Sequence, residues 1–199
     1  SEQLLARARH LSQLLVKLFS KLTKLRVLQM TGNDIPYWPD NVLHDSRHSL
    51  VRLYLISNNL RQLAPRSFAD MTELQTVDLS SNQLRQLDGG LLKEAPNLRH
   101  LRAARNLLRK LPLSLLARVK SLTAKLESVD VSKNRYLTQL VSDEQLAAGQ
   151  GLAPLVSFNM SDCSLTDQFF AVANIVNNAR SHQVPVAQLF ASLNELVSI

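Results

Sequence analysis

The sequence is poor in several kinds of residue, and each shortage excludes a class of protein. It has one cysteine, Cys163, so an internal disulfide cannot form and a small disulfide-stapled secreted domain is excluded for this chain. Five glycines leave little material for phosphate-binding loops, and the G-x-x-x-x-G-K-S/T, G-x-G-x-x-G and H-E-x-x-H patterns do not occur. No apolar run approaches the roughly 18 residues that cross a bilayer. We therefore expect a protein that is not an enzyme and that carries no metal or other cofactor.

Leucine and positive charge are what the sequence has in excess. Leucine occupies 40 of the 199 positions. The net charge of +7 is uneven, because residues 1–120 hold 19 Lys and Arg against 9 Asp and Glu, whereas residues 121–199 hold 4 against 7. A basic field of this kind favours an acidic protein, a nucleic acid or an anionic membrane as a partner. The alternative is a solvated surface that keeps the protein soluble.

The leucines follow a pattern of the form L-x-x-L-x-L-x-x-N-x-L that recurs six times. Successive copies begin at Leu25, Leu50, Leu74, Leu98, Leu126 and Leu155. The spacing between them runs 25, 24, 24, 28 and 29 residues, and the last apolar position of the fifth copy is assigned to Tyr136. The pattern resembles the leucine-rich repeat family over roughly residues 22–170.

This resemblance implies a fold. The expectation is a single α/β domain over residues 1–199, a leucine-rich-repeat solenoid shaped as a curved horseshoe. Parallel strands would form its concave sheet, and loops or short helices would form its convex side. We expect an N-terminal capping helix over residues 1–24, about six repeats over residues 25–165, and a helical cap or a partial further repeat over residues 166–199.

The copies point to two different compartments. The 24-residue copies look like the typical class of animal leucine-rich repeats, which is common on receptors and matrix proteins. The copies of 28 and 29 residues leave room for convex helices near Ser142 and from Asp167, and resemble the intracellular, ribonuclease-inhibitor-like class. The single cysteine and the lack of a secretory signal favour an intracellular location. An extracellular location applies if the chain is a fragment of a receptor.

Within each copy, side chains of the strand are expected to alternate between the core and solvent. Leu28 and Met30 would point inward, and Gln29 and Thr31 outward. The asparagine position is predicted to be buried, because its amide satisfies backbone groups that would otherwise cost about 1–3 kcal/mol each. This structural ladder comprises Asn33, Asn58, Asn82, Asn106, Asn134 and Cys163. Cys163 is accordingly predicted to be buried and unreactive.

Residues 3–22 are predicted to form an amphipathic helix. Its apolar stripe would hold Leu4, Ala8, Leu11, Leu15, Leu18 and Leu22, with lysines and arginines elsewhere. The favoured interpretation is a cap that shields the first copy, since a solenoid must cover its terminal core. A basic helix that binds an anionic membrane, the remnant of an organellar presequence and a site for a partner helix remain as alternatives.

Outward strand residues are expected to line the concave face, where repeat proteins of this shape bind. In the fourth copy Arg99, Arg102 and Arg105 would converge with His100, and our hypothesis is that this basic patch recognises an acidic segment of a protein. The alternative is a solvated strand balanced by Asp78 and Asp130. The predicted partner-binding residues are Arg26, Arg52, Tyr54, Asp78, Arg99, His100, Arg102, Arg105, Asp130 and Lys133.

Three functions fit the sequence. The first is a non-enzymatic scaffold that binds another protein on its concave face, either alone or within a larger assembly. The second is the ligand-binding ectodomain of an extracellular or innate-immune receptor, although the usual cysteine caps are missing. The third is an RNA-associated module, suggested by the pI of 9.9 and by the similarity of residues 93–98 to linkers in messenger-RNA export domains. An aromatic content of 5% weakens the third function, because RNA-binding surfaces use aromatic side chains.

His44 and His48 are the one candidate for a metal site. They lie four residues apart, with Asp45 between them, a spacing that could hold a metal on a helix. A third ligand is not evident. We therefore interpret both histidines as surface residues of the loop between the first two copies.

Overall fold

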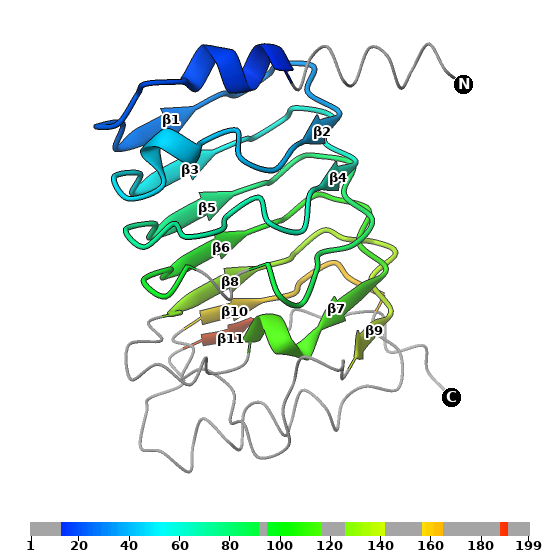
Figure 1. Cartoon of the computed structure of the whole chain (residues 1–199). Coiled ribbons are helices and arrows are strands. Elements are labelled where there is room, and N and C mark those ends of the chain that lie inside the picture. Colours follow the sequence, from blue (N-terminus) through cyan, green and yellow to red (C-terminus); the bar gives the residue numbers. More distant parts are fainter. Residues whose placement is uncertain (1–12, 92–94, 117–125, 142–156, 165–187, 191–199) are drawn as a thin grey trace, which may run out of the picture.

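The computed structural model describes residues 13–91, 95–116, 126–141, 157–164 and 188–190. There the chain winds as a solenoid whose main sheet has seven strands in the order β1-β3-β5-β6-β8-β10-β11 (Figure 1). All neighbouring strands are parallel. The strands are β1 (Val27–Gln29), β3 (Arg52–Tyr54), β5 (Thr76–Asp78), β6 (His100–Arg102), β8 (Ser128–Asp130), β10 (Ser157–Asn159) and β11 (Gln188–Phe190).

A turn of the solenoid is called a coil below. Coil one contains β1, coil two β3, coil three β5, coil four β6, coil five β8 and coil six β10, and β11 follows β10 in the sheet. The register places equivalent residues side by side. The middle row is apolar and buried, and consists of Leu28, Leu53, Val77, Leu101, Val129 and Phe158. The rows on either side of it face outward, although Thr76 and Asp78 of β5 are buried, and we call their surface the outer face. This alternation is the one that the sequence pattern predicted, because successive side chains of a strand point to opposite faces.

One buried cluster runs through all six coils. It begins at Leu15 and Phe19 and continues to Met160 and Cys163. No single coil could bury its own apolar side, but stacked coils merge their leucines into a continuous interior. The fifth coil departs from the expected pattern at one position. Tyr136, assigned to the core from the sequence, is 60% exposed, and Leu137 is fully buried in its place, because this coil has one additional residue after the ladder asparagine.

Short strands and 3₁₀ turns form the side of the solenoid opposite the main sheet. The strand β2 (Tyr37–Trp38) pairs with β4 (Gln62–Leu63), and β7 (Lys110–Pro112) pairs with β9 (Gln139–Val141). The two 3₁₀ turns are η1 (His44–Ser46) and η2 (Leu113–Leu116). The sequence predicted apolar side chains on this side, and Trp38 and Phe68 are almost completely buried there. It did not predict that short parallel strands would carry some of them.

The N-terminal helix buries a different face from the one that the sequence predicted. Residues 13–19 are helical, and Leu15 and Phe19, four residues apart, are buried in the core cluster. Leu18 and Leu22, expected on the buried stripe, are 60% and 42% exposed. Two residues at i and i+4 are enough to cover the core in so short a segment, and Phe19 has displaced Leu18 from that position. The helix ends before Lys21, which has a left-handed φ of 68° and donates its N–H to Asp45 Oδ2 at 2.7 Å.

The ends of the predicted domain are described only in part. Residues 1–12 of the expected helix, and the expected convex helices after Ser142 and Asp167, lie outside the described residues. The strand β11 adds a seventh strand to the sheet, with Ser157 in register with Gln188. Within the described ranges no helix has the length and apolar character to span a membrane.

Candidate functional site

A ladder of buried asparagines shapes the turn at which each strand leaves the sheet. Asn82 donates from Nδ2 to the carbonyl of Leu55 in the preceding coil at 2.8 Å, and its Oδ1 accepts the N–H of Leu60 at 2.9 Å. Asn106 and Asn134 make equivalent bonds to their own preceding coils. Each amide therefore satisfies backbone groups of its neighbour that would otherwise be buried without partners.

The first positions of the ladder differ from the expectation. Asn33, predicted to be buried, is exposed, and its Nδ2 donates to the carbonyl of Thr31 at 3.4 Å. The physical reason is that no described strand precedes β1 in the sheet, so Asn33 has no earlier coil to bond. Asn58 is fully buried, but its Oδ1 has no partner among the described residues. Ile35, whose N–H would be the equivalent donor, instead bonds the main-chain oxygen of Asn58 at 2.8 Å.

Cys163 occupies the sixth ladder position as a thiol. Its Sγ donates to the carbonyl of Val131 at 3.4 Å, the same kind of contact that the asparagines make. Burial is the main cause that raises the pKa of Cys163 to about 11, and the charges of Asp162 and Asp130 add to it. The side chain is therefore a neutral hydrogen-bond donor at physiological pH, and not a thiolate nucleophile.

The residue before each ladder position has a left-handed backbone. These residues are Gly32, Ser57, Ser81, Arg105, Lys133 and Asp162, with φ between 54° and 74°. Arg105 donates its N–H to Ser132 at 2.9 Å, and Lys133 donates its own to Ser161 at 2.8 Å, so the two basic residues occupy equivalent turns of adjacent coils. Arg105 thus lies in the turn after its strand, and does not converge with Arg99 and Arg102 within the strand as the sequence suggested.

The outward row that runs from Gln29 to Asn159 is called the central row of the outer face below. It alternates in charge at Asp78, Arg102 and Asp130. Arg102 is in register with Asp78 on one side and with Asp130 on the other. Arg102 Nη1 lies 3.8 Å from Asp78 Oδ2. Backbone hydrogen bonds also hold both carboxylates in place. Asp78 Oδ1 accepts the N–H of Ser80 at 2.9 Å, and Asp130 Oδ1 accepts the N–H of Ser132 at 3.0 Å. The positive charge of Arg102 is therefore balanced within the face.

Arg99 is balanced as well. Its Nη1 lies 3.2 Å from Glu127 Oε1 of the next coil. His100, half-buried, stands in a row with Thr76 and Ser128. Arg102 therefore faces Asp78, as the alternative of a balanced strand predicted, and recognition of an acidic segment by this strand stays a prediction. Glu127 was missed because the contact joins residues 28 positions apart, and only the repeat spacing could have indicated it.

Basic residues without a carboxylate partner among the described residues lie on the outer face and beside it. Arg52 is exposed on β3 and Arg26 is exposed directly before β1, and Tyr54 follows on the same strand as Arg52. Arg105 and Lys133 are exposed in their turns. In the part of the chain that the structure describes, none of these four basic side chains forms an ion pair.

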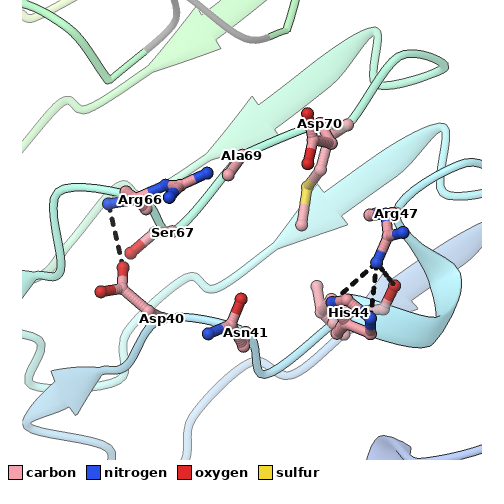
Figure 2. A pocket seen from close by; sticks show the side chains of 10 residues that line it. Asp40, Asn41, His44, Arg47, Arg66, Ser67, Ala69 and Asp70 are labelled. Atoms are coloured by element: carbon pink, nitrogen blue, oxygen red, sulfur yellow. Dashed lines mark hydrogen bonds between the residues drawn. The ribbon is translucent and has the colours of Figure 1, made fainter.

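A pocket of about 390 Å³ opens between the loops of coils one and two, away from the outer face. Figure 2 shows its lining, in which Asp40 accepts the N–H of Arg66 at 2.9 Å and the guanidinium of Arg47 contacts the ring of His44 at 2.6 Å. Arg47 also donates to His48 at 3.1 Å, so a cation lies against both histidines of the predicted pair. Among the described residues no three His, Cys, Asp or Glu side chains gather as a metal site would require.

Stacked parallel strands, buried leucine rows and an asparagine ladder define a repeat solenoid. A family model for leucine-rich repeats matches residues 48–108, which include the strands β3, β5 and β6 and the ladder residues from Asn58 to Asn106. Residues 48–108 therefore carry leucine-rich repeats. A search of curated proteins gives no match.

Proposed function

We propose that this chain is a recognition module that binds a partner protein on the outer face of its sheet. Leucine-rich repeats form protein-interaction modules, and each row of the outer face presents one side chain per coil in a fixed register. The observation that carries the proposal is the central row of Gln29, Tyr54, Asp78, Arg102, Asp130 and Asn159. These side chains stand on strands whose inner row is buried, so they are ordered before a partner arrives, which lowers the entropy cost of binding.

The partner should carry acidic groups over the first two coils. Arg26 and Arg52 lack carboxylate partners in the described part of the chain, whereas Arg99 and Arg102 already have them. An acidic segment gains more from an unpaired guanidinium than from one that is already neutralised. Tyr54 beside Arg52 adds the combination of aromatic and guanidinium groups that is common in the centres of interfaces. Arg105 and Lys133 would extend the contact at the turn edge.

The residues of the same row argue against RNA as the ligand of this face. Asp78 and Asp130 hold two carboxylates in its centre, and a phosphate backbone would be repelled there. Tyr54 and His100 are the two side chains in the outward rows of β1, β3, β5, β6, β8 and β10 whose rings could stack on a base, and they lie on strands that are not adjacent. Both features favour a protein with mixed charge.

Affinity capture from native extract tests this proposal. Wild type is compared with Arg26→Glu/Arg52→Glu and with Lys17→Glu/Lys21→Glu, a control that makes the same change in charge outside the sheet. Nuclease treatment accompanies each capture. We expect a protein that wild type and the control retain and that the outer-face variant loses by at least about tenfold, as for the loss of charged hot-spot contacts. Equal retention by all three forms, or loss on nuclease treatment, would show that the proposal is wrong.

A further inference from the structure

Three consecutive coils place an arginine at the same point on the flank of the solenoid. The motif N-x-L-R-Q/K-L occurs at residues 58–63, 82–87 and 106–111. Its leucines, Leu60, Leu84 and Leu108, are fully buried, and the arginine after each of them is exposed. These arginines are Arg61, Arg85 and Arg109, which we call the arginine column. They lie beyond the ladder turn and so outside the strands of the outer face.

The column is a stack of like charges with little to compensate it. Arg109 donates its N–H to the carbonyl of Arg85 at 3.3 Å, so adjacent members are joined through the backbone. Arg61 donates from Nε to the neutral amide oxygen of Gln83 at 3.3 Å. Within the described ranges none of the three forms an ion pair. Neighbouring coils lie about 4.8 Å apart, so the column repels itself unless an anion binds along it.

An exposed aromatic ring stands at the end of the column. Thr138 donates its N–H to the carbonyl of Arg109 at 3.1 Å, which places the loop of coil five directly after the third arginine. The additional residue in this loop sends Leu137 into the core and leaves Tyr136 60% exposed. Among the described residues it is the one large hydrophobic side chain outside residues 14–27 that is exposed. Arginine and tyrosine together are enriched in the energetic centres of protein interfaces.

We propose that the arginine column and Tyr136 form a second docking surface, which binds an acidic amphipathic α-helix of a partner protein. Carboxylates at i, i+3 or i+4 and i+7 of a helix are spaced by about 5–6 Å, and seven residues span about 10.5 Å. Two steps of the column span about 10 Å, so three carboxylates can each face one guanidinium. An apolar residue one turn further along the helix would then reach Tyr136.

Other anions fit this spacing less well. Side chains on one face of an extended strand repeat about every 6.6 Å, so they would fall out of register with the arginine column over two of its steps. Phosphates of a nucleic acid strand repeat about every 3.4 Å along the axis of a duplex, which is shorter than the step of the column. Binding of a second copy of this chain through the same surface is unfavourable, because two positively charged arginine columns would face each other. The acidic helix is the occupant that matches both the spacing and the charge.

Fluorescence anisotropy with three labelled probes tests the proposal on the full chain. The first probe is an alanine-based 20-residue helix with Glu at i, i+4 and i+7 and Leu at i+11. The second has the same composition, with the glutamates distributed around the helix. The third is a 20-nucleotide single-stranded RNA. The variants are Arg85→Glu/Arg109→Glu and Tyr136→Ser, and Lys17→Glu/Lys21→Glu makes the matched change in charge at exposed residues outside both proposed binding surfaces.

We expect the aligned peptide to bind at least tenfold more tightly than the scrambled one. Arg85→Glu/Arg109→Glu should weaken it by at least tenfold, Tyr136→Ser by at least threefold, and the Lys17→Glu/Lys21→Glu control by less than twofold. Because all substituted side chains are exposed, unchanged thermal unfolding confirms that the variants are folded. Absence of binding by the aligned peptide, equal binding of both peptides, or equal loss in the Lys17→Glu/Lys21→Glu control overturns the proposal. RNA that binds more tightly than the aligned peptide, and is lost in Arg85→Glu/Arg109→Glu, overturns it in favour of a nucleic-acid site.

Discussion

The side-chain amide of Asn82 donates to the carbonyl of Leu55 at 2.8 Å, and so joins two coils through groups that are both buried. The same side chain accepts the N–H groups of Asn58 and Leu60, each at 2.9 Å. The ladder residue of one coil therefore completes the hydrogen bonding of the coil before it.

Replacing Asn82 by leucine should destabilise the fold although it adds apolar volume. Several buried backbone groups would lose their partner, each at about 1–3 kcal/mol, so we expect a total loss of about 3 kcal/mol or more. Asn33→Leu is the matched control, because Asn33 is exposed and bonds no other coil. Urea unfolding followed by circular dichroism measures both. Similar losses at the two positions would contradict a role for the interior hydrogen bonds.

The helix provides a second pair of variants. Leu15→Ala should cost about 2–5 kcal/mol because Leu15 is buried in the core cluster. Leu18→Ala should cost less than about 0.5 kcal/mol, because Leu18 is exposed. Chemical unfolding distinguishes this orientation from the one that the sequence pattern suggested. If Leu18→Ala were the more harmful change, the helix would pack through its other stripe.

A substitution at Gly32 measures the cost of the left-handed backbone alone, because an added side chain meets no neighbouring atom. A Cβ built there meets no atom within 4 Å, but the φ of 74° disfavours an L side chain. Gly32→Ala should therefore destabilise by about 1 kcal/mol. Ser81→Gly, at the equivalent turn with a φ of 58°, should be neutral or stabilising, since glycine adopts this conformation without steric cost. Thermal unfolding of the two variants should shift the midpoint in opposite directions or move only the first.

The raised pKa of Cys163 predicts a loss of stability in alkali. Burial, followed by the charges of Asp162 and Asp130, raises the pKa from 9.0 to about 11, so folding favours the protonated thiol. Its contribution is complete below pH 9 and declines as the pH rises through about 11. Burial and Asp40 also raise the pKa of Tyr37, so the measurement must compare wild type with Cys163→Ala across this range.

The expected result is a steeper fall in unfolding free energy for wild type than for Cys163→Ala between pH 9 and 11. Reaction of the thiol with a disulfide reagent should also be slow at neutral pH and accelerate only in alkali. Parallel stability curves for the two proteins would show that the thiol does not titrate with a raised pKa.

The repeating features were predictable because they are local. Alternation within a strand placed Leu53 and Val77 in the interior, and the asparagine pattern indicated where each strand ends. The exposure of Asn33 was not predictable in the same way, because its environment depends on a neighbouring coil and not on its own repeat. For the same reason the short strands around Trp38 were missed, since they form only when two coils stack.

The candidate site was less predictable than the fold. Arg99 and Arg102 were expected to form a basic patch because they are close in sequence. Asp78 was named from the sequence as a balancing charge for this strand, but Glu127, the partner of Arg99, lies 28 residues further on in the next coil, and one repeat alone does not indicate that contact. Tyr136 shows the same limit, because one additional residue was enough to exchange it with Leu137 between surface and core.

The asparagine ladder gives the solenoid a direction. Each ladder amide belongs to one coil and hydrogen-bonds backbone groups of the coil before it. The first and last coils of a shortened solenoid would therefore differ chemically. Removing coils from the front leaves an asparagine in water, as at Asn33, where solvent can satisfy it. Removing them from the back strips buried N–H and C=O groups of their partners. Repeats of this protein should therefore be trimmed or added most safely at the leading edge, and each trailing edge will require a purpose-built cap.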